Sequence, residues 1–172
     1  MKSGTYYSNP WKMPGGKDFN RPTFQLEGVY LEGWTWENDQ YLFLNELSVT
    51  NRGEDSIVKD WEVCLVVDGK PLTFKPGLIP KDDVMLQTGE KITNDQTLTE
   101  KAIREPIKHG NVLTGWVAFS VPKELALRLM AAPRMPDGAF RFEDYLAHTY
   151  SYDFVGGPNS ALKNMPYIPG KN

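Results

Sequence analysis

The stretch YLFLNELSVTNRGEDSIVKDWEVCLVVDG, from Tyr41 to Gly69, decides the fold class of this chain. It contains two runs rich in β-branched and aromatic residues, which flank the polar residues 51–55. Apolar runs of this kind, bounded by Asn, Gly and Asp, are the usual sequence signal of a β-hairpin. We therefore expect two long strands joined by a polar turn, within an all-β fold.

Other runs of the sequence carry the same strand signal, namely residues 24–36, 112–121, 140–142 and 145–154. The first of them contains Gly28 and Gly33, and glycines inside a strand often mark a bulge or a bend. The run 58–67 is apolar at both parities, which is typical of a central strand covered on both faces. Several strands with turn signals between them predict an antiparallel sandwich.

The connections between these strands contain two helix signals. Thr97 and Glu100 have the spacing of a capping box, so we expect a short helix there, ended by Pro106. Pro122 precedes the run KELALRLMAA, which predicts a second helix, either at one end of the sandwich or crossing between its sheets. Residues 82–95 are polar and indicate an excursion over the surface.

Proline and glycine set the limits of the domain. Both are frequent in residues 1–22 and 156–172, which we interpret as an N-terminal arm and a C-terminal tail around a β-sandwich domain at residues 23–155. Both segments also hold large apolar side chains, which disordered segments usually lack. We therefore expect at least one of them to dock on its own domain or on a second copy, and docking on a second copy would give a homodimer. The alternative is that both segments are mobile alone and bind a partner.

Charge and composition argue against two classes of partner. The formal net charge is -3, so no basic field favours nucleic acid. No run of about 18 apolar residues exists, so we expect no membrane span. The first eleven residues lack the apolar core of a signal peptide. We expect a cytoplasmic protein if Met1 is the native start, and an extracytoplasmic one if a leader or anchor was removed.

Two segments of the chain resemble a known group of domains. They are LSVTNRG at residues 47–53, followed by the tryptophan strand that ends in DG at 68–69, and GWVAFSVP at residues 115–122. Together they look like the immunoglobulin-like sandwich domains of unknown function found in many bacterial surface and secreted proteins. The resemblance covers about residues 24–154. It implies an immunoglobulin-like antiparallel β-sandwich with an extracytoplasmic binding or scaffold role, and it supplies no catalytic residues.

The residues that usually carry catalysis or metal binding form no pattern here. His109 and His148 are the only histidines, and neither a G-x-S-x-G elbow nor an H-x-x-x-H spacing occurs. The single cysteine, Cys64, lies mid-strand and is expected to be a small buried hydrophobe. We therefore expect no enzyme activity, no metal and no cofactor. A small enzyme with an unrecognised pocket remains an alternative.

Aromatic residues give the main rival function. Tyr30, Trp34 and Trp36 share strand parity, so their rings face the same side if no bulge intervenes. A row of exposed rings can stack on sugars, which makes a carbohydrate-binding module the first alternative. The competing interpretation is that these rings fill the core, as we expect of Trp61 and Trp116 on opposed sheets.

The sequence thus predicts a non-catalytic interaction or scaffold module, placed at a bacterial envelope. A protein partner is expected, with carbohydrate as the alternative ligand.

Overall fold

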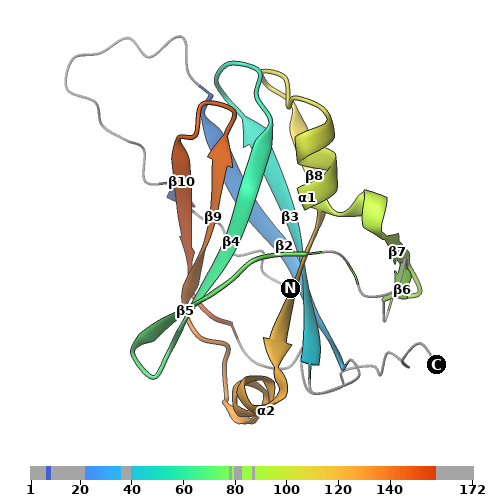
Figure 1. The fold of residues 1–172 in the computed structure, drawn as a ribbon, viewed down its shortest axis with the longest axis vertical. Coiled ribbons are helices and arrows are strands. Elements are labelled where there is room, and N and C mark those ends of the chain that lie inside the picture. Colours follow the sequence, from blue (N-terminus) through green and yellow to red (C-terminus); the bar gives the residue numbers. More distant parts are fainter. Residues whose placement is uncertain are drawn as a thin grey trace.

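In the computed structural model, residues 7–8, 22–35, 40–77, 79, 83–86 and 88–157 are described. Two antiparallel sheets lie face to face (Figure 1). The first sheet has the strand order β1 (Tyr7–Ser8), β10 (Thr149–Phe154), β9 (Gly138–Asp144), β4 (Val58–Val67) and β5 (Lys70–Phe74). The second has the order β2 (Phe24–Thr35), β3 (Gln40–Asn51) and β8 (Val112–Pro122). The all-β fold class is therefore confirmed.

The main core fills the space between the two sheets. Alternate residues of β3 and β8 point inward because side chains along a strand alternate between its faces. Phe43 of β3 stacks on Phe119 of β8 with ring centroids 5.5 Å apart. On the facing sheet, the ring centroids of Trp61 of β4 and Phe142 of the neighbouring strand β9 lie 4.7 Å apart. Each fully buried side chain of this size contributes roughly 1.5–3 kcal/mol.

The predicted hairpin between β3 and β4 is wrong. β3 pairs with β2 and β8, whereas β4 pairs with β5 and β9, so the polar turn carries the chain from one sheet to the other. Two strands joined within one sheet and two strands joined across sheets have the same apolar runs and the same turn residues. Only the pairing partners distinguish them, and those lie far away in the sequence.

Residues 82–95 were expected to run over the surface, and the described part of this segment does so, but as a regular ribbon with one buried face. Here β6 (Asp83–Met85) and β7 (Lys91–Thr93) pair into a two-stranded ribbon. The ribbon covers the outer face of the sheet β2–β3–β8 and forms a second apolar cluster, made of Leu42, Leu44, Ile79, Val84, Leu86, Ile92, Trp116 and Ala118. In this segment the cluster includes Val84, Leu86 and Ile92. These three residues are separated by polar ones, so the sequence shows no strand signal.

Trp61 and Trp116 are buried on opposed sheets, as predicted, with 5% and 4% of their surfaces exposed. Their surroundings differ, however. Trp61 belongs to the core between the sheets, while Trp116 points outward from β8 and lies under the β6–β7 ribbon.

Both predicted helices are present. The 3₁₀ turn η1 (Asn94–Gln96) leads into α1 (Leu98–Arg104), where the Thr97 hydroxyl accepts a hydrogen bond from the Glu100 N–H at 3.4 Å. The second helix, α2 (Lys123–Ala131), follows Pro122 and buries Ala126 and Leu129. It lies beyond the strand ends, as expected (Figure 1). No helix among the described residues is long and apolar enough to cross a membrane.

Two further features concern the edges of the sheets. The register of β2 against β3 shifts between Gly28 and Tyr30, so the bulge predicted for this strand is present at the first of its two glycines. Tyr7 and Ser8 pair with Asp153 and Tyr152 of β10. The other residues of the N-terminal arm up to 21, and residues 158–172 of the tail, lie outside the described residues.

Candidate binding site

Three loops meet at one end of the two facing sheets. They are the crossing from β3 to β4, the loop between α1 and β8, and the β9–β10 turn. Ser56 in the first loop forms a β-bridge with Ile107 in the second, and its hydroxyl accepts a hydrogen bond from the Tyr145 N–H at 3.3 Å. Connecting loops held on a rigid scaffold are where proteins most often place binding residues.

Asn51 joins the first two loops from a fully buried position. Its side-chain amide donates to the carbonyl oxygens of Ile107 at 2.7 Å and Glu54 at 2.6 Å. Its side-chain oxygen accepts from the Gly53 N–H at 2.9 Å. The Asn51 side chain of the Asn-x-Gly motif therefore holds the first two loops together.

His109 takes part in the same contact between loops. Its backbone N–H donates to a carboxylate oxygen of Asp55 at 2.8 Å. The Nδ1 atom of its ring lies 3.0 Å from the Gly53 carbonyl oxygen. A carbonyl oxygen only accepts, so the proton of this bond belongs to Nδ1. The His109 ring is thus engaged in holding the turn.

His148 and Asp144 form a hydrogen-bonded histidine–aspartate pair, an arrangement that also occurs in active sites. The buried Asp144 carboxylate accepts from the N–H groups of Leu146 and His148, from His148 Nδ1 at 3.0 Å, and from the Tyr150 hydroxyl at 3.0 Å. Ala147 between them has a positive φ of 62°. These bonds close the β9–β10 turn around the carboxylate and satisfy its oxygens in the buried position.

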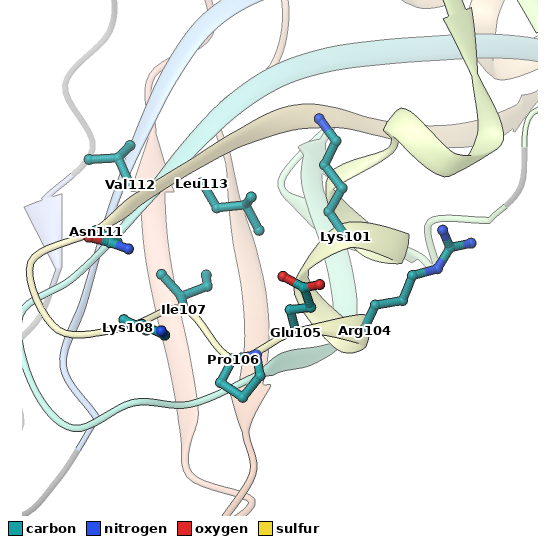
Figure 2. Close-up of a pocket in the computed structure, with 9 residues that line it drawn as sticks. All are labelled: Lys101, Arg104, Glu105, Pro106, Ile107, Lys108, Asn111, Val112 and Leu113. Carbon is teal, nitrogen blue, oxygen red and sulfur yellow. The ribbon is translucent and has the colours of Figure 1, made fainter.

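A hollow of about 290 Å³ lies beside these loops, between α1 and the start of β8 (Figure 2). Its lining residues come from the C-terminal end of α1, the following loop and the first strand positions, namely Lys101, Arg104, Glu105, Pro106, Ile107, Lys108, Asn111, Val112 and Leu113. We call it the end pocket. Glu105 ends α1 in an extended conformation, and Pro106 prevents a further turn, so the chain leaves the helix and forms one wall.

The lining of the end pocket mixes apolar and charged side chains. Ile107 is buried and Leu113 half-buried, while the side chains of Lys101, Arg104 and Lys108 are at its edges. Figure 2 shows the Glu105 carboxylate turned toward the middle of the pocket and the Arg104 guanidinium turned away from it. Arg104 pairs with Glu100 at 3.3 Å, and Lys101 donates to the Thr114 carbonyl oxygen at 3.2 Å.

The charge of Lys101 also reaches the outer face of β3. Burial raises the pKa of Glu46, the carboxylate of Glu90 raises it further, and the Lys101 ammonium opposes both effects.

The aromatic residues predicted to bind sugar are only partly described. Tyr30 and Trp34 lie in β2, opposite Glu46 and Leu42 of β3. The register is regular between them, so the condition for a shared side is met by the backbone. Nothing is described of their side chains, and Trp36 lies outside the described residues. Their role in ligand binding stays a prediction.

Sequence reasoning did not find the end pocket. The segment KAIREPIKHG, residues 101–110, does combine basic and apolar residues within ten positions, which is the signal that was present. It was interpreted only as a helix and its end.

No protein-family model matches the chain, and no characterised protein sequence does. Among solved structures, a putative lipoprotein from Bacillus subtilis is similar, with 8% identity and a TM-score of 0.42 over 82% of this chain. The match covers 39% of that protein, so this chain spans well under half of its length. The putative ApaA protein from Bordetella pertussis gives 9% identity and a TM-score of 0.34, over 80% of this chain and 93% of that one.

Proposed function

We propose that the chain is a non-catalytic interaction module with an immunoglobulin-like sandwich fold, which binds a protein partner through the loops at the end pocket. The observation that carries this proposal is the end pocket itself, an open hollow whose lining mixes apolar side chains with those of Lys101, Arg104 and Lys108. Mixed surfaces of this kind suit protein recognition, in which apolar contact gives affinity and charge gives orientation.

The use of the two histidines supports the same proposal. His109 is hydrogen-bonded to Gly53 and His148 to Asp144, both within loops that these bonds hold in shape. Groups that fix loops provide a rigid frame for a binding surface, and a preorganised surface loses less entropy on association. We further propose a position at the bacterial envelope, which rests on the resemblance of the motifs at residues 47–53 and 115–122.

Cross-linking tests the proposal. The purified chain would be treated with an amine-reactive cross-linker in an envelope extract of its source cells, and the adducts identified by mass spectrometry. We expect one saturable partner, with cross-links from Lys101 or Lys108, and a defined complex with that purified partner in analytical ultracentrifugation. Absence of any saturable partner would contradict an interaction role.

A carbohydrate-binding module is the second candidate, favoured by the regular register of Tyr30 and Trp34 in β2. Titration with soluble polysaccharides, followed by tryptophan fluorescence, tests it. A shift that Trp34→Ala abolishes without loss of stability would place this function first. No shift with any glycan would remove it.

A further inference from the structure

Two large apolar side chains follow one another at the tip of the β9–β10 turn. Tyr145 is 49% and Leu146 is 48% exposed. Among the exposed large apolar side chains of the described residues, these two alone are neighbours in the sequence. Single exposed apolar residues are normal on protein surfaces, so the pair, rather than either side chain by itself, requires an explanation.

The backbone beneath the pair is held in one conformation. The buried Asp144 carboxylate accepts from the Leu146 N–H at 2.8 Å and from the His148 N–H at 3.0 Å. The Tyr145 N–H donates to the Ser56 hydroxyl at 3.3 Å, which fixes the turn against the neighbouring loop. Tyr145 and Leu146 are therefore exposed on a rigid support.

Ala147 makes the turn more rigid, although its backbone is strained. Its N–H donates to the Asp144 carbonyl oxygen at 3.1 Å, and its φ of 62° lies in the left-handed region, where glycine is the usual residue. Alanine has fewer conformations than glycine in the open turn, so it limits the motion of the tip. Strained backbone of this kind tends to occur where a protein contacts a ligand. A support that is already ordered also loses less entropy on binding.

The charges beside the turn disfavour two classes of partner. The two other loops at this end of the sheets (Figure 1), residues 52–57 and 105–111, hold two cations against three carboxylates, namely Arg52, Lys108, Glu54, Asp55 and Glu105. Nucleic acids and anionic lipid surfaces are bound through an excess of positive charge, which these loops lack. A mixed rim around an apolar centre is instead the usual composition of a protein–protein interface.

We propose that the β9–β10 turn is the anchor of the protein–protein contact, and that Tyr145 and Leu146 enter an apolar cleft of a partner protein. This rests on the proposed function as an interaction module. Tyrosine is enriched among the residues that dominate binding energy, and such residues lie near the centre of an interface. Because a stable interface covers about 800 Å² of each partner, the neighbouring loops supply the rest of the contact area.

The first test uses β-cyclodextrin, whose apolar cavity accepts a single side chain, in place of the cleft. It is titrated into the full chain labelled with nitrogen-15, and amide resonances are recorded. We expect shifts at residues 144–148 that Tyr145→Ser abolishes. Leu127→Ser is the matched control, because Leu127 is 45% exposed on α2, at the other end of the sheets (Figure 1), and it should leave these shifts unchanged. The absence of shifts at residues 144–148, or shifts that persist in Tyr145→Ser, would overturn the inference.

The second test uses the partner protein that cross-linking identifies. Tyr145→Ser and Leu146→Ser are each expected to weaken the complex about tenfold, whereas Leu127→Ser leaves its affinity unchanged. Each variant is checked for a native spectrum before titration. The same variants are assayed for self-association and for binding to phosphatidylserine vesicles.

The outcomes separate this inference from the proposed function. A complex that Tyr145→Ser and Leu146→Ser leave intact, or weaken no more than Leu127→Ser does, overturns the inference while the proposed function stands. Self-association or vesicle binding that Tyr145→Ser abolishes would assign the turn to a second copy or to a lipid surface, and would overturn it too. If no partner is cross-linked, the proposed function fails and the inference fails with it.

Discussion

A 2.7 Å hydrogen bond from the Asn51 side-chain amide to the Ile107 carbonyl oxygen joins two loops that lie 56 residues apart in the chain. It fixes the crossing between the sheets against the wall of the end pocket. The stability of the fold and the shape of the candidate site therefore depend on the same side chain.

Replacing Asn51 should destabilise the whole domain. Asn51→Ala removes the donor to the Ile107 and Glu54 carbonyl oxygens and the acceptor of the Gly53 N–H, while Ile107 keeps only its bond from the Ser56 N–H. We expect a cost of about 1–3 kcal/mol for each polar group left unpaired. Asn51→Asp should cost more, because a carboxylate would face two carbonyl oxygens. Urea unfolding curves measure both variants, with Ser48→Ala, which loses only a solvent-exposed hydrogen bond to Thr114, as the control. A decrease of less than about 0.5 kcal/mol in the free energy of unfolding of Asn51→Ala would contradict the role of Asn51 in holding the two loops together.

The tryptophans should respond differently to substitution. Truncation of Trp61 or Trp116 to alanine is expected to cost about 3–5 kcal/mol, as for other large buried rings. The Trp61 indole N–H, however, is buried and has no hydrogen-bond partner among the described residues. Trp61→Phe removes that unpaired donor together with some contact area, so its cost should be smaller than that of Trp116→Phe.

Thermal and urea unfolding of the four tryptophan variants would measure these costs. The reverse order for the two phenylalanine variants would mean that the Trp61 N–H is hydrogen-bonded in solution.

Gly138 should not tolerate a side chain. A Cβ at this position would lie 2.2 Å from the Cys64 carbonyl oxygen and 2.6 Å from the Phe154 ring, closer than real atoms approach. Gly138→Ala must push β9 away from its neighbours, at about 1–3 kcal/mol or more. Gly77→Ala is the matched control, because a Cβ there meets nothing within 4 Å. Equal stabilities of the two variants would contradict the packing of β9.

The class of the fold was predictable from sequence, and its topology was not. The strands at residues 58–67 and 112–121 and the capping of α1 by Thr97 depend on local patterns, which a sequence carries in full. The separation of β3 and β4 depends on their pairing with β8 and β9, some 70 residues away, and no local pattern records that choice. The ribbon β6–β7 was missed because Val84, Leu86 and Ile92 are buried only by contact with the outer face of the second sheet.

The candidate site was the harder part for the same reason. Lys101, Lys108 and Val112 were visible in the sequence as helix, turn and strand residues. Their common pocket arises from the way α1 packs beside β8, where the Thr97–Trp116 bridge and the close approach of Gly115 to Leu98 set the distance. Such contacts between elements are properties of the folded chain.

The last prediction concerns pH and the carboxylates of Glu46 and Glu90. Burial, and then the Glu90 charge, raise the pKa of Glu46 above its usual value of 4.5, so the folded state binds a proton at Glu46 more tightly than the unfolded state does. Stability therefore falls as the pH rises through the interval above 4.5, because the folded protein must lose that proton.

Glu46→Gln keeps the neutral form at every pH. We expect this variant to be more stable than the wild type at pH 7 and equally stable at pH 4, as measured by urea midpoints. Glu90→Gln should show a smaller gain, because it removes only the second cause. A Glu46→Gln variant less stable than the wild type at pH 7 would mean that the Lys101 attraction outweighs burial.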